Sequence, residues 1–157
     1  TAETSIDLPV SAYIGDSYIT DYSRRIGAYK RIASITDRGG WFDVYDEIED
    51  RFGTVPQSVS NLMEIALIKN YASKFGISDI TGRADEILMK FDGECTPDLQ
   101  NAITLMNEMP KKLFLTNPSN PTLHYKIKRP APNGETKYLK EICDITAKIC
   151  GADDGNI

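Results

Sequence analysis

The stretch that decides the fold is residues 56–76, which read PQSVSNLMEIALIKNYASKFG. Pro56 suits the first residue of a helix, and Gly76 suits the left-handed residue that ends one. The apolar residues between them cover more than one helical stripe: Val59, Leu62, Met63, Ile65, Ala66, Ile68, Ala72 and Phe75. A helix that is apolar on several sides is buried on several sides, so we expect this helix to be the most buried element of the chain.

Two shorter helices are predicted ahead of this segment. Asp21 is an N-cap for a helix that runs to about Thr36, and the residues predicted to form its buried stripe are Ile26, Tyr29, Ile32 and Ala33. A second helix begins near Gly40 and ends at Phe52, where Gly53 closes it. Its predicted core face consists of Trp41, Val44, Tyr45, Ile48 and Phe52. We expect residues 1–20 to form an extended lead-in, in which residues 6–10 are either an edge strand or part of the extended segment.

From Ile77 onward the apolar period changes from helical to alternating. The expected elements are a strand pair at 77–81 and 86–91, a helix opened by Thr96-Pro97 and ended before Pro110, a second strand pair at 113–116 and 123–128, and a helix from about Glu135 to Gly151. Residues 152–157 are expected to be a frayed tail. Three helices followed by two strand pairs, with a helix between the pairs and one at the end, predict an α+β domain with one core over residues 1–157.

The composition is typical of a water-soluble globular domain. The 157 residues are 41% hydrophobic and 26% charged, and 23 acidic against 18 basic residues give a net charge of −5. No apolar run is long enough to cross a membrane. Three cysteines in no regular framework predict a reducing, cytoplasmic setting. The chain opens on Thr1 rather than Met, so we expect it to be a piece of a longer protein.

A search for catalytic chemistry finds few candidates. The sequence has no glycine-rich phosphate loop and one histidine, His124, which strand alternation places on an exposed face with no orienting acid beside it. Cys143 and Cys150 are seven residues apart on one helix, too far apart for a disulfide or a zinc pair. We therefore expect no catalytic, cofactor or metal site, although a small hydrolase using the carboxylates of Asp46 and Glu47 is an alternative.

The second helix carries a more specific polar pattern. Glu47, Asp50 and Arg51 are at positions i, i+3 and i+4 and hence share one face. One interpretation is an intrahelical salt bridge of little energetic weight. The other is an acid-rich docking patch that pairs with arginines of a partner.

A second alternative is contact with nucleic acid. The basic residues that would make it are Lys111, Lys112, Lys126, Lys128 and Arg129. The negative net charge argues against it as the main function, since phosphate contacts dominate nucleic-acid affinity.

Several phrases, read in order, resemble one family. They are Ile6-Asp7-Leu8-Pro9-Val10 with Ala12-Tyr13-Ile14, Tyr18-Ile19 with Asp21, Tyr29-Lys30-Arg31-Ile32-Ala33, Asp50-Arg51-Phe52-Gly53 with Pro56, Leu62 through Lys69, and Gly76-Ile77. Together they are similar to the C-terminal domain of the bacterial transcription-repair coupling factor. The resemblance is carried by the first half of the chain, to about Phe91.

The resemblance implies a regulatory role. The parent of that family is a large DNA translocase that uses ATP and Mg, acts on stalled RNA polymerase, binds double-stranded DNA and recruits excision repair through UvrA. Its C-terminal domain packs on the UvrA-binding module of the same polypeptide and keeps the motor repressed. We expect Glu47, Asp50 and Arg51 to form part of this intramolecular contact with the UvrA-binding module.

Overall fold

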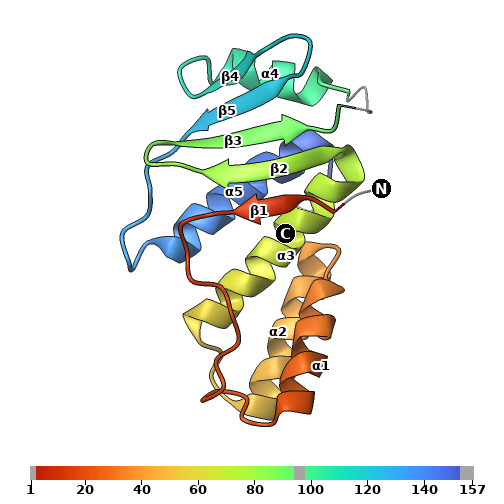
Figure 1. Ribbon diagram of the computed structural model, residues 1–157, viewed down its shortest axis with the longest axis vertical. Helices are drawn as coiled ribbons and strands as arrows, with labels where there is room; N and C mark the ends of the chain where they lie inside the picture. The colour runs from red at the N-terminus through yellow and green to blue at the C-terminus, as the bar shows by residue number, and fades with distance from the viewer. Residues whose placement is uncertain (1–2, 94–97, 153–157) are drawn as a thin grey trace.

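The computed structural model describes residues 3–93 and 98–152. Within this part of the chain, the helices are α1 (Tyr22–Ala33), α2 (Arg38–Phe52), α3 (Gln57–Phe75), α4 (Gln100–Glu108) and α5 (Glu135–Cys150). The strands are β1 (Ser5–Asp7), β2 (Ile77–Gly82), β3 (Glu86–Phe91), β4 (Leu113–Thr116) and β5 (Thr122–Lys126). The predicted α+β class and the predicted order of helices and strand pairs are confirmed (Figure 1).

The strands form one sheet in the order β1-β2-β3-β5-β4. The two predicted strand pairs are antiparallel hairpins that join where β3 pairs with β5. The predicted edge strand exists at residues 5–7 and pairs with β2 in parallel, with Ser5 opposite Asp79. Local sequence indicated the hairpins, but the joining of β3 to β5 and of β1 to β2 depends on contacts between distant segments.

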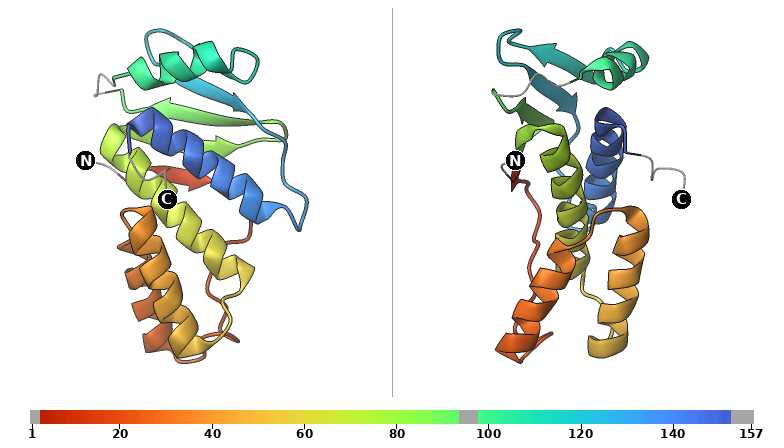
Figure 2. Two further views of the ribbon diagram at one scale, coloured as in Figure 1. Left: turned by 180° about the vertical axis from the view of Figure 1, so that it is seen from behind. Right: turned by 90° about the vertical axis from the view of Figure 1, so that its right-hand side faces the viewer.

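Helices cover one face of the sheet (Figure 2). α3, α4 and α5 all lie on the same side of the strands, and α1 and α2 form a hairpin that extends beyond the sheet at the other end of α3. Alternation along β3 follows this arrangement, because Ile87, Met89 and Phe91 are buried under the helices, as predicted. In the described part of the chain, the opposite face of the sheet has no helix over it.

α3 is the central helix, as the sequence predicted. Met63, Leu67 and Ile68 are completely shielded from solvent, and Gly76 ends the helix at φ +93°, a left-handed conformation that glycine adopts without strain. Pro56 is the N-cap rather than the first helical residue. Two polar residues of α3, Asn61 and Glu64, are also buried, which the apolar pattern did not indicate.

The two preceding helices begin where short acidic side chains cap them. The Asp21 carboxylate accepts a hydrogen bond from the Arg24 backbone N–H at 3.1 Å, which confirms the predicted cap. The Asp37 carboxylate accepts a hydrogen bond from the Gly40 backbone N–H at 2.7 Å. Asp37 is therefore the N-cap of α2, which begins at Arg38, two residues earlier than predicted.

The predicted buried stripe and end of the first helix are wrong in part. Ile26 and Ala33 are exposed, and the buried side of α1 is formed by Ala28 and Ile32. α1 ends at Ala33 instead of Thr36, because Ser34 caps it and the chain turns so that Ile35 enters the core.

Two downstream boundaries also differ from the prediction. β5 ends at Lys126 rather than Lys128, because the backbone N–H groups of Ile127 and Arg129 donate to the β2–β3 turn instead of a neighbouring strand. The predicted opening of the fourth helix at Thr96-Pro97 and residues 153–157 of the predicted tail lie outside the described residues.

The end of β2 is packed tightly against two other parts of the chain. A Cβ atom built on Gly82 would lie 2.7 Å from Pro9 Cδ and 2.8 Å from the Tyr138 hydroxyl oxygen. Only glycine fits here, because no real side-chain carbon approaches other atoms so closely. Gly82 thus lets the segment after β1 and helix α5 meet over the end of the sheet.

Candidate functional site

The predicted docking residues lie on the outer side of the α1–α2 hairpin. Glu47 does not pair within its own helix: its Oε2 accepts from Arg31 Nε of α1 at 3.1 Å, with both side chains more than two-fifths exposed. The interpretation as an intrahelical salt bridge is therefore wrong for Glu47. Asp50 and Arg51 are exposed, and Asp50 forms no ion pair with any residue the structure describes.

The position of Arg51 is fixed by the residues that follow it. Its guanidinium lies 5.0 Å from the centroid of the Phe52 ring, and Phe52 meets the edge of Tyr18 at 6.2 Å. The Tyr18 hydroxyl donates to the Gly53 carbonyl at 2.8 Å. The Arg-Phe-Gly sequence therefore holds a cation at the end of α2, against a loop that precedes α1.

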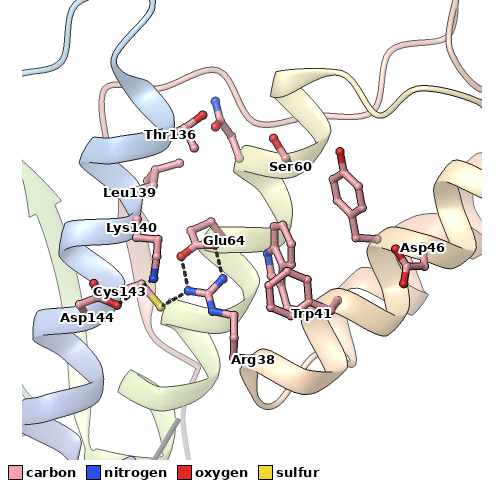
Figure 3. Close-up of a pocket in the computed structure, with 13 residues that line it drawn as sticks. Arg38, Trp41, Asp46, Ser60, Glu64, Thr136, Leu139, Lys140, Cys143 and Asp144 are labelled. Atoms are coloured by element: carbon pink, nitrogen blue, oxygen red, sulfur yellow. Dashed lines mark hydrogen bonds and ion pairs between the residues drawn. The ribbon is translucent and has the colours of Figure 1, made fainter. Parts of the chain in front are cut away.

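A pocket of about 580 Å³ lies on another side of α2, between α2, α3 and α5 (Figure 3). The α2 side of it is aromatic: the Trp41 and Tyr45 rings stack at 5.3 Å with an interplanar angle of 16°, and Phe42 is half exposed. α5 contributes Lys140 and Asp144, which form an exposed ion pair with each other at 3.3 Å.

The inner end of the pocket is formed by a buried ion pair that the sequence did not reveal. Both terminal nitrogens of Arg38 donate to the Glu64 carboxylate, at 2.7 and 2.6 Å, and each side chain is about one-tenth exposed. Arg38 also donates to Cys143 Sγ at 3.5 Å and lies 5.4 Å from the Trp41 ring. One guanidinium thus joins α2, α3 and α5.

The cysteines that the structure describes are free thiols. Burial, with the negative charge of Glu64 beside it, raises the pKa of the Cys143 thiol far above its ordinary value. Burial alone raises the pKa of Cys150 to about 12. Both residues behave as small core side chains, as predicted, and Cys95 lies outside the described residues.

The acidic residues proposed for a hydrolase do not converge. Asp46 borders the pocket near Trp41, whereas Glu47 points to Arg31 of α1. Across residues 3–93 and 98–152, no group of three His, Cys, Asp or Glu side chains is arranged to hold a metal ion, and no helix is long and apolar enough to span a membrane.

His124 is on the predicted side of its strand, but its side chain is only 18% exposed, so the prediction of an exposed histidine was wrong. Its Nε2 lies 2.8 Å from the Thr116 hydroxyl, and its Nδ1 lies 3.2 Å from Glu86 Oε2. The expectation that no acid lies beside it was therefore wrong, because Glu86 and Thr116 belong to the two neighbouring strands.

The predicted basic residues gather at one end of the sheet. Lys112 and Lys126 are brought together by a backbone hydrogen bond of 2.7 Å, and Arg129 is tied to the β2–β3 turn by a bond to Ala84. Lys111 and Lys128 are exposed beside them.

Comparison with known proteins decides the family. A family model described as the TRCF domain matches residues 8–102, which is more than half of the chain. The chain belongs to the TRCF domain family. The matched residues include all of α1, α2 and α3 and the α2 surface described above.

Relatives of this TRCF domain are transcription-repair-coupling factors. That of Rickettsia prowazekii (strain Madrid E) is 31% identical over 142 residues, which are 89% of this chain and 11% of the relative. The Bacillus subtilis (strain 168) protein is 30% identical over 72% of the chain and 10% of its own length. The Escherichia coli (strain K12) protein is 27% identical, with 74% and 10% covered. The TRCF domain described here thus spans about a tenth of the curated relatives that it matches.

The fold of this TRCF domain also has a solved counterpart. A crystal structure of the C-terminal domain of transcription-repair coupling factor matches with a TM-score of 0.79 over 100% of this chain and 99% of that one, at 21% identity. The resemblance found in the sequence is confirmed.

Proposed function

We propose that this TRCF domain is a non-catalytic regulatory domain that docks on the UvrA-binding module of its own polypeptide. In this role it keeps an ATP-dependent DNA translocase of transcription-coupled excision repair repressed. The observation that supports the proposal best is the exposed face of α2, where Glu47, Asp50 and Arg51 stand together on a helical hairpin that is braced by Arg31. The names of the relatives connect such a domain with transcription and repair.

The chemistry of this face suits arginines on the partner. The Asp50 carboxylate has no ion pair within the described residues, and Glu47 shares its carboxylate with one exposed guanidinium. Each carboxylate can accept two parallel hydrogen bonds from an incoming guanidinium. Arg51 can in turn pair with an acid of the partner, because the Phe52 ring holds it in place. A polar interface of this kind is weak enough to open when another ligand competes for the partner surface.

The remaining functions belong to the rest of the parent polypeptide in this proposal. RNA polymerase, UvrA, double-stranded DNA, ATP and Mg would bind to other modules, in the cytoplasm. Asp46 and Glu47 diverge, which favours docking over the hydrolase alternative for these residues.

The test is a calorimetric titration of the domain with the UvrA-binding module of its parent. The variant is Glu47→Lys with Asp50→Lys. The matched control is Asp46→Lys with Glu49→Lys, which has the same spacing and charge change but is turned by one residue, about 100°, around α2. We expect binding to be lost in the first pair and retained in the second, with circular dichroism unchanged in both.

Two results would count against the proposal. Equal loss in both pairs would mean that only the total charge matters, and unchanged binding in the first pair would move the interface elsewhere. No heat of binding for the wild type, up to about 1 mM, would exclude a self-sufficient docking domain.

A further inference from the structure

The face of the sheet that no helix covers carries a row of side chains that are not part of the hydrophobic core. The side of β3, β5 and β4 that faces the viewer in Figure 1 has no helix over it in the described chain. Strand alternation places on this side the residues of β3, β5 and β4 whose neighbours are buried under the helices. Those that matter here are Lys112, Phe114, Thr116, His124, Lys126 and Lys90.

The centre of this face is a fixed aromatic pair. The Phe114 and His124 rings, directly opposite each other on β4 and β5, stack at 4.6 Å with an interplanar angle of 6°. Hydrogen bonds to Thr116 and Glu86 fix the imidazole on both sides. Phe114 is 36% exposed, an unusual position for a phenylalanine. A flat apolar ring surface is therefore presented to solvent on a rigid support.

Three lysines lie around this pair. Lys112, which directly precedes β4, is joined to Lys126 of β5 by a backbone hydrogen bond, and Lys90 projects from β3. None of the three forms an ion pair with any residue in 3–93 or 98–152. Two acids lie on the same face: Glu86 is opposite Lys126 and hydrogen-bonds His124, and Asp79 is opposite Lys90. Lys112 and Lys126 are the cations at the end of the sheet next to the aromatic pair.

We propose that this face of β3, β5 and β4 binds single-stranded nucleic acid. A base stacks on Phe114, and the phosphates next to it pair with Lys112, Lys126 and Lys90. Unpaired bases stack readily on exposed aromatic side chains, and lysines neutralise the phosphates between them. A duplex hides the faces of its bases inside the helix, so it cannot use the ring. The net charge of −5 limits binding to a few phosphates.

The first measurement is fluorescence anisotropy of a labelled oligothymidine of about 15 nucleotides, titrated with the whole chain. Three neutralised phosphates on a single strand predict a slope of about −2 in log affinity against log salt. The affinity is then expected to fall about 15- to 20-fold between about 50 and 200 mM salt. A duplex of the same length should bind more weakly than the single strand.

Two variants separate stacking from charge. Phe114→Ala should weaken binding about 5- to 150-fold, whereas Tyr22→Ala, at an even more exposed aromatic residue of α1, should not. Lys112→Glu with Lys126→Glu should reduce the slope to about −0.7, whereas the charge-matched Lys30→Glu with Lys74→Glu should leave it near −2. Circular dichroism checks that each variant is folded. The sheet face is remote from α2, so these changes leave the docking surface intact (Figure 1).

Any of three results would overturn the proposal. They are no binding by the wild type up to about 1 mM at low salt, unchanged affinity in Phe114→Ala, and a duplex that binds as tightly as the single strand. An equal effect of the two lysine pairs would also contradict it, because the total charge and not this surface would then be responsible.

Discussion

The buried ion pair between Arg38 and Glu64 gives the sharpest prediction about stability. Glu64→Gln keeps the shape of the side chain but removes its charge, so Arg38 loses the carboxylate that accepts from both of its terminal nitrogens. Removing one partner of a buried pair costs about 3–5 kcal/mol of unfolding free energy. With an unfolding entropy of about 0.33 kcal/mol/K for 157 residues, the melting temperature should fall by about 9–15 °C.

The same substitution at an exposed pair is the control. Glu47→Gln breaks a contact of 3.1 Å to Arg31, but both side chains are more than 40% exposed, against about 10% for the buried pair. An exposed ion pair contributes about 0–1 kcal/mol, so Glu47→Gln should lower the melting temperature by no more than about 3 °C. Thermal denaturation followed by circular dichroism measures the melting temperature of both variants.

A double variant tests the cause. Arg38→Met with Glu64→Met removes both charges, so it should recover most of the stability lost in Glu64→Gln, because the two partners of the buried pair are replaced together by apolar side chains. The reasoning is refuted if Glu64→Gln costs no more than Glu47→Gln. It is also refuted if the double variant is less stable than Glu64→Gln.

Three further predictions concern tight packing, capping and alkaline pH. Gly82→Ala should lower the unfolding free energy by about 1–3 kcal/mol, because its Cβ would collide with the Tyr138 hydroxyl. Asp37→Ala should lower it by about 1 kcal/mol through loss of the α2 cap. Burial, together with the hydrogen bond to Glu141, raises the pKa of Tyr125 to about 12, and burial raises the pKa of Cys150 to about 12. The unfolded chain releases these protons at lower pH, so stability should be full below pH 9 and fall from there towards pH 12.

Each of the three has a simple check in urea denaturation. Gly27→Ala is the control for Gly82→Ala, since nothing lies within 4 Å of its Cβ, and it should be neutral or stabilising. Asp43→Ala, in the body of α2, should cost less than Asp37→Ala. For alkaline pH, Tyr125→Phe should flatten the fall between pH 10 and 12; an unchanged profile would contradict the assignment.

Local patterns predicted most elements of this fold. The multi-sided apolar pattern of α3 indicated its central position, and the change to alternation at Ile77 marked the first hairpin. The sequence did not show that β5 joins β3, because that pairing depends on how two hairpins meet over shared helices. Local sequence patterns therefore predicted the helices and strands and their order, whereas tertiary packing determined which strands pair.

The candidate sites were predicted less completely, for the same reason. Glu64 looked like one polar interruption in an apolar helix, and its partner Arg38 is 26 residues away at the start of another helix. Phe114 and His124 are ten residues apart and meet only through strand pairing. That Glu47, Asp50 and Arg51 lie on one face of α2 could be predicted, because residues at positions i, i+3 and i+4 of a helix are neighbours on its surface.

The position of β1 has a consequence for the kinetics of folding. Ser5 pairs with Asp79, 74 residues further along the chain, whereas β2 to β5 all follow α3 and connect over shorter distances. Contacts between remote segments form late, because closing a long loop costs entropy before the contact stabilises it. Three residue pairs join β1 to β2. We therefore expect it to be the last strand to join the sheet and the first to release its amide hydrogens to exchange in the native state.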